Sequence, residues 1–184
     1  SADVVTLAAE PRWPSCPEVE RQPGTVAART ALLREGLELG LERLWRRLGQ
    51  PPANNASGTG EEANVLSVLG GAAAEMDLHG NLTAAEHLLR LAFAHQRGDG
   101  YLPWLPTDIA NTNWDGHGVL LGFLQLVPLL YRHGHLFSPA LVEFLRPRLA
   151  LGLAASSAQG SADLLYTNIL IGKITNEIMI GGWL

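Results

Sequence analysis

Apolar side chains recur every three or four residues between Thr25 and Leu48, which is the spacing of one face of an α-helix. Arginine and glutamate fill most of the positions between them. The apolar positions are Ala28, Leu32, Leu33, Leu37, Leu41, Leu44, Trp45 and Leu48. We therefore predict an amphipathic helix that begins near Gly24 or Thr25. The preceding residues 1–24 are rich in proline and have no such period, so we expect an extended N-terminal arm there.

Two kinds of helical segment alternate after a linker rich in glycine, proline and asparagine at residues 49–60. Segments that are apolar on almost every side are expected over residues 61–80, 111–131 and 164–184. Amphipathic segments are expected over residues 83–96 and 139–156. The chain thus repeats an amphipathic helix followed by an apolar helix three times.

Local signals mark where these helices begin and end. Thr83 and Glu86 have the spacing of a capping box, in which each side chain bonds the backbone of the other residue. Pro139 follows a serine and suits the first position of a helix. Pro147 is expected to kink or stop that helix, because proline removes a backbone donor.

An asparagine near the start of each apolar segment defines a repeat. Asn64, Asn113 and Asn168 lie 49 and 55 residues apart, which is typical of stacked helical hairpins. Apolar helices inside and amphipathic helices outside predict an all-α fold for residues 25–184, with three hairpins that form part of an α/α toroid. A solenoid has the same local pattern. Because a full toroid has six hairpins, we expect a second half in a longer chain or a homo-oligomer that covers the open inner face.

The composition narrows the classes of partner. The chain has 184 residues, 47% of them hydrophobic, which suits one domain with a substantial core. Its net charge is −5 and no basic stripe follows any helix, so we expect no nucleic-acid partner. The longest apolar run, residues 119–131, is too short to cross a membrane, and we expect no membrane partner. The first residues lack the pattern of a signal peptide and equally fit a mature end after cleavage, which leaves a secreted or periplasmic location open.

Cysteine and histidine patterns favour neither a metal nor a cofactor. Cys16 is the single cysteine, which excludes an intrachain disulfide and a cysteine-based metal site. The chain has no His-Glu-x-x-His motif, no phosphate-binding glycine loop and no serine nucleophile elbow. His133 and His135 lie at the far end of the expected helix, roughly 24–27 Å from His117 at a rise of 1.5 Å per residue. We therefore expect no metal and no cofactor.

Polar side chains gather where the apolar segments begin, above all in the run NTNWDGHG at residues 111–118. In a ring of hairpins the inner helices start on the same side, so these clusters would surround one mouth of a central cavity. Indole rings stack on sugar rings, and amides and hydroxyls bond sugar hydroxyls, so the pattern predicts a glycan partner. The expected site residues are Glu62, Asn64, Tyr101, Trp104, Asn111, Asn113, Trp114, Asp115, His117, Tyr166 and Asn168.

Ordinary structural roles compete with this interpretation. The asparagines near the helix starts are good N-caps, and Trp104 lies among prolines where it suits loop packing.

Two alternatives for the chemistry also stay open. His117 with Asp115 is the best acid/base pair, because imidazole titrates near neutrality. Glu61 or Glu62 with Asp115 or Asp108 would instead provide the two carboxylates of a glycoside hydrolase, and the spacing does not select among these pairs. Besides these two enzyme alternatives, a non-catalytic helical-hairpin module that binds or assembles also stays open.

Residues 85–184 resemble the toroid of hyaluronate and chondroitin lyases. The run NTNWDGHGVLLGFLQLVPLL at residues 111–130 resembles the stretch where an Asn-Trp pair and an acidic residue precede an inner helix. The run GSADLLYTNILIGKITNEIMIGG at residues 160–182 resembles the inner helix that follows. The resemblance implies a polysaccharide lyase that cleaves a uronate-containing glycan by β-elimination.

The resemblance also implies roles for individual residues. In those lyases an asparagine neutralises the uronate carboxylate, and a histidine and a tyrosine move the protons. Carried onto this chain, Asn113 and Asn168 bind the carboxylate or hydroxyls, His117 is the base and Tyr166 is the acid. The stacking residues are Trp104 and Trp114.

The chain departs from the lyase pattern in two places. Asp163 stands where the family has an amide, and a carboxylate there would repel a uronate. The catalytic histidine and tyrosine of the family lie further along than Leu184. Trp114 is the element that matches in place.

Overall fold

The computed structural model describes residues 23–49, 63–103, 115–158 and 167–184, and this part of the chain is helical without any strand. The elements are α1 (Pro23–Leu48), α2 (Val65–Ala74), the π-helix η1 (Glu75–His79), α3 (Leu82–Ala94), α4 (Asp115–His133), the 3₁₀ helix η2 (Gly134–Leu136), α5 (Pro139–Ala158) and α6 (Thr167–Trp183). The all-α prediction is confirmed. None of the described helices combines the length and the apolarity that spanning a membrane requires.

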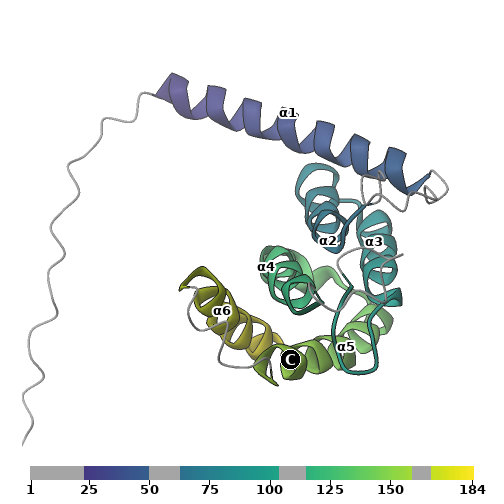
Figure 1. Ribbon diagram of the computed structural model, residues 1–184. Helices are drawn as coiled ribbons and strands as arrows, with labels where there is room; N and C mark the ends of the chain where they lie inside the picture. Colours follow the sequence, from purple (N-terminus) through teal and green to yellow (C-terminus); the bar gives the residue numbers. More distant parts are fainter. Residues whose placement is uncertain (1–22, 50–62, 104–114, 159–166) are drawn as a thin grey trace, which may run out of the picture.

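Helices α2 and α4 lie side by side (Figure 1), and two contacts between them show that they run in the same direction. Leu69 in the middle of α2 packs on Gly122 in the first half of α4, where a Cβ would lie 2.9 Å from Leu69 Cδ1. Asp77, beyond the end of α2, pairs with Arg132 near the end of α4. Contacts therefore advance along both helices together, which is the signature of a parallel pair.

Helices α4 and α6 pack in the same parallel sense. The Tyr131 hydroxyl donates a 2.8 Å hydrogen bond to the Met179 carbonyl, and three residues later Gly134 approaches the Trp183 indole. Helices α2, α4 and α6 are therefore a row of parallel inner helices, as the alternation along the sequence predicts.

Helices α3 and α5 form the second layer, on the outer side of this curved row (Figure 1). Gln96, just past α3, donates a 2.9 Å hydrogen bond to the Arg148 carbonyl in α5. The guanidinium groups of Arg90 and Arg148 both lie over the Phe144 ring, 4.5 and 3.8 Å from its centre. Inner and outer helices alternate as predicted, while the closure of the row into a ring stays a prediction.

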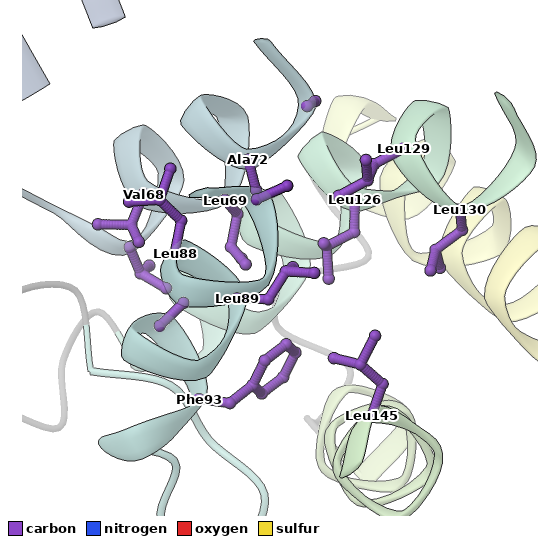
Figure 2. Packing of buried hydrophobic residues seen from close by; sticks show 14 of the residues in the cluster. Val68, Leu69, Ala72, Leu88, Leu89, Phe93, Leu126, Leu129, Leu130 and Leu145 are labelled. Atoms are coloured by element: carbon purple, nitrogen blue, oxygen red, sulfur yellow. The ribbon is translucent and has the colours of Figure 1, made fainter. Parts of the chain in front are cut away.

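The core lies between the two layers (Figure 2). Leu69 of α2, Leu89 and Phe93 of α3, Leu126 of α4 and Leu145 of α5 converge there and are shielded from solvent. Each comes from the apolar face of its own helix, so the three-and-four spacing places them together.

Glycine lets the α4 and α5 backbones approach in this core. Phe123 of α4 packs so closely on Gly152 of α5 that a Cβ there would collide with its ring. The centre of the same phenyl ring lies 6.2 Å from the centre of the Phe93 ring, and the two rings are tilted, a geometry that aromatic pairs favour.

The predicted capping box at the start of α3 is wrong. The N-cap is Asn81, whose side-chain oxygen accepts a 3.1 Å hydrogen bond from the Ala84 amide, so the helix begins before Thr83. Gly80 ends the preceding helix in a left-handed conformation and turns the chain directly into Asn81. Glu86 lies within the helix and pairs with Arg90 one turn later.

The start of α5 follows the prediction. Ser138 accepts a 3.1 Å hydrogen bond from the Leu141 amide, and Pro139 takes the first helical position. Pro147 does not stop the helix, which continues to Ala158. Packing of α5 against the core outweighs the loss of one backbone hydrogen bond.

Candidate functional site

The inner helices bring their N-terminal ends to one side of the molecule, where the sequence predicts the site. Asn64 precedes α2, α4 starts at Asp115 and α6 starts at Thr167. Because these three helices are parallel neighbours, their free backbone N–H groups lie at the same end of the row. Such an end attracts negatively charged groups through the helix dipoles.

Most of the predicted site residues lie outside the residues that the structure describes. They are Glu62, Trp104, Asn111, Asn113, Trp114 and Tyr166, together with Asp163 of the lyase comparison. Asp115 and His117 lie in the first turn of α4, and Asn168 lies in the first turn of α6, but their side chains are not among the described ones. Their roles stay predictions.

Two predicted site residues are described in full. Asn64 is the N-cap of α2: its side-chain oxygen accepts a 2.8 Å hydrogen bond from the Ser67 amide. Tyr101 is half-buried, its hydroxyl donates to the Ala155 carbonyl at 3.3 Å, and the Arg97 guanidinium lies 5.9 Å from its ring centre. Both side chains therefore already have structural contacts.

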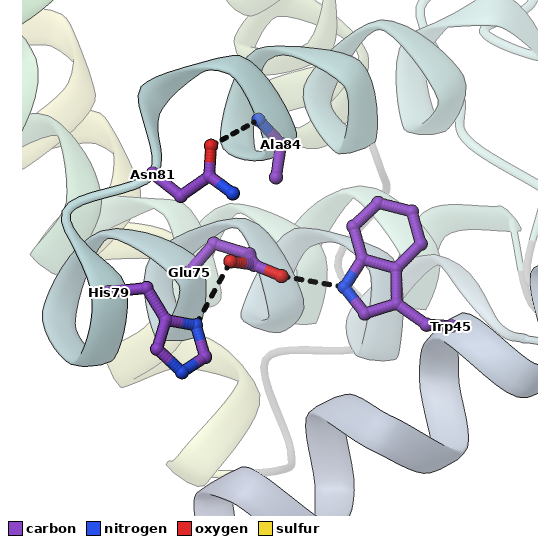
Figure 3. Close-up of polar contacts among 5 residues, drawn as sticks. All are labelled: Trp45, Glu75, His79, Asn81 and Ala84. Carbon is purple, nitrogen blue, oxygen red and sulfur yellow. Dashed lines mark hydrogen bonds and ion pairs between the residues drawn. The ribbon is translucent and has the colours of Figure 1, made fainter.

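The opposite end of the inner helices holds a cluster that the sequence analysis did not single out (Figure 3). Glu75 is only 5% exposed, and its Oε1 accepts a 2.6 Å hydrogen bond from the Trp45 indole. Its other oxygen, Oε2, lies 3.2 Å from His79 Nδ1. The indole of Trp45 stacks on the His87 ring, with centres 6.0 Å apart. This buried carboxylate links α1 to the end of α2, so its visible role is to hold α1 in place.

A second polar contact at this end joins η1 to α4. Asp77 pairs with Arg132 at 2.5 Å through one oxygen and with His133 at 2.7 Å through the other. His133 therefore lies in the last turn of α4, at the end far from His117, as the sequence predicts. Among the described residues, no group of three or more histidine, cysteine, aspartate or glutamate side chains is placed to hold a metal ion.

A signal for the Glu75 cluster was present in the sequence. Glu75 follows three alanines and is one of two acidic residues in the otherwise largely apolar stretch 63–80. A carboxylate on an apolar helix needs a donor if it is to be buried. The indole N–H of Trp45, which lies on the apolar face of the preceding helix, supplies it.

The first half of α1 exposes an apolar stripe that the fold leaves uncovered. Leu41 and Leu44 pack on α2 and are buried, but every described side chain from residue 26 to residue 40 is exposed. Leu33, for example, is 69% exposed although it shares the face of Leu41. We define the α1 stripe as Val26, Leu33 and Leu37. The sequence predicts this apolar face, but α1 is much longer than the helix it covers.

A second uncovered apolar surface lies along α6. The α6 row consists of Ile171, Ile174 and Ile178, all exposed, and Ile178 is 65% exposed. Asn176 and Ile180, on the opposite side of the helix, are buried. The apolar pattern of α6, which extends to almost every side in the sequence, therefore does not mean that every side is buried. Helices α4 and α5 both pack on α6, and no described helix covers the side that carries the α6 row.

The comparisons with known proteins give no family for this chain. No protein-family model, no curated protein and no solved structure matches it. Any function must therefore be argued from the residues and the geometry described above.

Proposed function

We propose that the chain is a carbohydrate-active protein whose site lies at the N-terminal end of the inner helices. The observation that supports this proposal is the parallel packing of α2, α4 and α6, which gathers three helix starts at one end. Oriented backbone N–H groups there favour a carboxylate-bearing ligand. A uronate-containing glycan has both a carboxylate for these donors and sugar rings on which indoles can stack.

The proposed reaction is β-elimination of the lyase type. Asn113 and Asn168 would bind the uronate carboxylate, which lowers the cost of removing the adjacent proton. His117 would remove that proton and Tyr166 would protonate the leaving oxygen. Trp104 and Trp114 would stack on the sugar rings.

The direct test is incubation with hyaluronate, chondroitin and alginate, followed by ultraviolet absorbance. Elimination creates a double bond conjugated to a carboxylate, so the product absorbs in the near ultraviolet, whereas a hydrolysis product does not. His117→Ala should slow product formation by about 10²–10⁴-fold, the usual contribution of a general base.

His135→Ala is the matched control, because it removes an exposed histidine at the other end of the molecule. The proposal fails if none of the three glycans gives an absorbing product and Trp114→Ala leaves glycan binding unchanged. Product that incorporates solvent oxygen without absorbing would instead indicate the glycoside hydrolase.

A second candidate function is a helical-hairpin module that assembles through protein contacts. The α1 stripe favours it, because the apolar face of α1 is buried at Leu41 and Leu44, where α1 meets α2, and continues as the exposed α1 stripe beyond that contact. An exposed apolar face on an amphipathic helix is typical of a surface on which another apolar helix docks.

Amide hydrogen exchange tests the assembly function. If the first half of α1 docks, the amides of residues 26–40 should become more protected as protein concentration rises. The variant Leu33→Glu/Leu37→Glu should abolish that gain. Exchange that is independent of both concentration and these substitutions would exclude docking through the α1 stripe.

A further inference from the structure

The turn between η1 and α3 carries a three-residue motif that helix capping does not fully explain. Asn81, Leu82 and Thr83 have the pattern Asn-x-Thr, in which the middle residue is not proline. This is the acceptor pattern for N-linked glycans, which are attached to asparagines at the protein surface. Because the same residue types suit the start of a helix, their contacts must separate a capping role from a modification site.

The cap of α3 uses only one of the two polar atoms of the Asn81 side chain (Figure 3). Its Oδ1 accepts the hydrogen bond from the Ala84 amide, while its Nδ2 makes no hydrogen bond within the described part of the chain. Aspartate, serine and threonine also cap helices well, because each brings an oxygen acceptor. Capping therefore does not require the nitrogen, which is the atom that N-glycosylation modifies.

Thr83 has a hydroxyl without a structural role. Thr30 and Thr175, the other two helical threonines whose side chains the structure describes, donate to the carbonyl one turn earlier at 2.9 and 2.8 Å. The Thr83 hydroxyl makes no hydrogen bond among the described residues. The predicted capping box is not formed, so no contact explains a hydroxyl at this position. A hydroxyl two residues after the asparagine is the second requirement of the acceptor pattern.

The surroundings of the turn suit a bulky attached group. Asn81 and Thr83 are both exposed, while Leu82 between them packs against the core and fastens the turn. Gly80 is also open, because a Cβ there would meet no atom within 4 Å. The turn follows η1 at the C-terminal end of α2, opposite the end at which the glycan-binding site is proposed. A group on Asn81 therefore leaves that end of the inner helices open.

We propose that Asn81 carries an N-linked glycan. The co-substrate is an oligosaccharide activated as a lipid diphosphate. Nδ2 attacks its anomeric carbon, a C–N bond forms, the C–O bond to the diphosphate breaks, and Nδ2 gives up one proton. Oδ1 is unchanged by this reaction, so the hydrogen bond from the Ala84 amide persists and the cap remains.

The inference goes beyond both proposed functions and depends on neither. It implies that the chain passes through a compartment in which such glycans are attached.

The test measures the occupancy of Asn81 in the full chain isolated from the cells that make it. Enzymatic release of N-linked glycans in water labelled with heavy oxygen converts an occupied asparagine to a labelled aspartate. Mass spectrometry of the peptide that holds residues 81–83 is expected to detect this label. A sample without the releasing enzyme is the control, because spontaneous deamidation also gives labelled aspartate.

Three variants made in the same cells separate the acceptor from the cap. Thr83→Ala should abolish the glycan, whereas Thr83→Ser should retain it, since serine also completes the acceptor pattern. Asn81→Asp should abolish the glycan and keep the cap, so its midpoint of urea unfolding should stay close to that of Thr83→Ala.

Three results would overturn the inference. An unlabelled Asn81 peptide shows that the residue is not modified. Label that persists in Thr83→Ala shows that the modification does not depend on the acceptor pattern. Label on Asn55, which begins the chain's Asn-x-Ser pattern, without label on Asn81 shows that the chain meets the modifying enzyme but that the turn is not an acceptor.

Discussion

Trp45→Phe should weaken the attachment of α1, because it removes the indole N–H that donates to the buried Glu75 carboxylate. The donor–acceptor distance is 2.6 Å and Glu75 is 5% exposed, so solvent cannot easily replace the lost hydrogen bond. A hydrogen bond to a charged group contributes about 1.5–3 kcal/mol to the free energy of unfolding. For a chain of this size, each kcal/mol lowers Tm by about 2–4 °C, so the hydrogen bond alone accounts for roughly 3–12 °C.

A double-mutant cycle separates the hydrogen bond from the packing loss of the smaller ring. The cycle combines Trp45→Phe with Glu75→Met, and unfolding in urea is followed by far-ultraviolet circular dichroism. The packing loss occurs with either residue at position 75 and cancels, which leaves a coupling of about 1.5–3 kcal/mol. Glu75→Gln is the informative control, because its amide oxygen still accepts from the indole. Its coupling to Trp45 should be about 0.5–1.5 kcal/mol, the value of a neutral hydrogen bond.

A coupling between Trp45 and Glu75 below about 0.5 kcal/mol, the usual error of additivity, would contradict this role of the hydrogen bond. Glu75 would then be stabilised by other groups, and α1 would be held by its leucines alone.

Three further predictions concern the turns and the far end of the bundle. Gly100→Ala should cost well over about 1–2 kcal/mol of unfolding free energy, since its φ of 95° disfavours a side chain and a Cβ would also collide with the Leu151 carbonyl. Gly80→Ala, with a φ of 61° and open space around it, should cost only the conformational penalty, so equal Tm values for the two variants would contradict this prediction. Asn81→Ala should cost about 1 kcal/mol in urea unfolding and Thr83→Ala much less, because Asn81 is the N-cap of α3, and the reverse order would restore the capping box. Asp77→Ala should cost about 0.5–1 kcal/mol at low salt and less at high salt, as expected for partly exposed ion pairs, and a salt-independent loss would show that packing dominates.

The sequence predicted the alternation of helices because that alternation depends on local spacing. Leu69, Leu89 and Leu126 occupy apolar positions within their own helices, and each is buried in the core. The period set by Asn64, Asn113 and Asn168 predicts neighbouring inner helices, and α2, α4 and α6 are indeed parallel neighbours. These features require only that each helix buries its own apolar side.

Other features depend on contacts between distant segments, which one sequence does not reveal. The spacing of Leu33 and Leu41 is the same helical pattern, yet one is 69% exposed and the other 5% exposed. The difference arises because α2 is shorter than α1 and lies under only one end of it. The spacing of residues also could not show that Asn81 and not Thr83 is the N-cap of α3, because this follows from the left-handed turn at Gly80. For the candidate site, the residue types could be predicted from the sequence. That the inner helices begin at the same end follows from their parallel packing, which is seen in the structure.

The two ends of the inner helices differ in how their polar groups are used, and this difference supports the proposal of a site at the N-terminal end. At the C-terminal end, both oxygens of Glu75 and both oxygens of Asp77 already contact partners within the chain. Binding a ligand there would first require breaking these contacts, which fasten α1 and α4. At the N-terminal end, Asn64 shows that a single amide is enough to cap an inner helix. In the sequence, the run at residues 111–118 holds two amides, an indole, a carboxylate and an imidazole, more than one cap requires. Substituting His117 should therefore reduce activity on a glycan with little loss of stability, whereas substituting Glu75 should do the opposite.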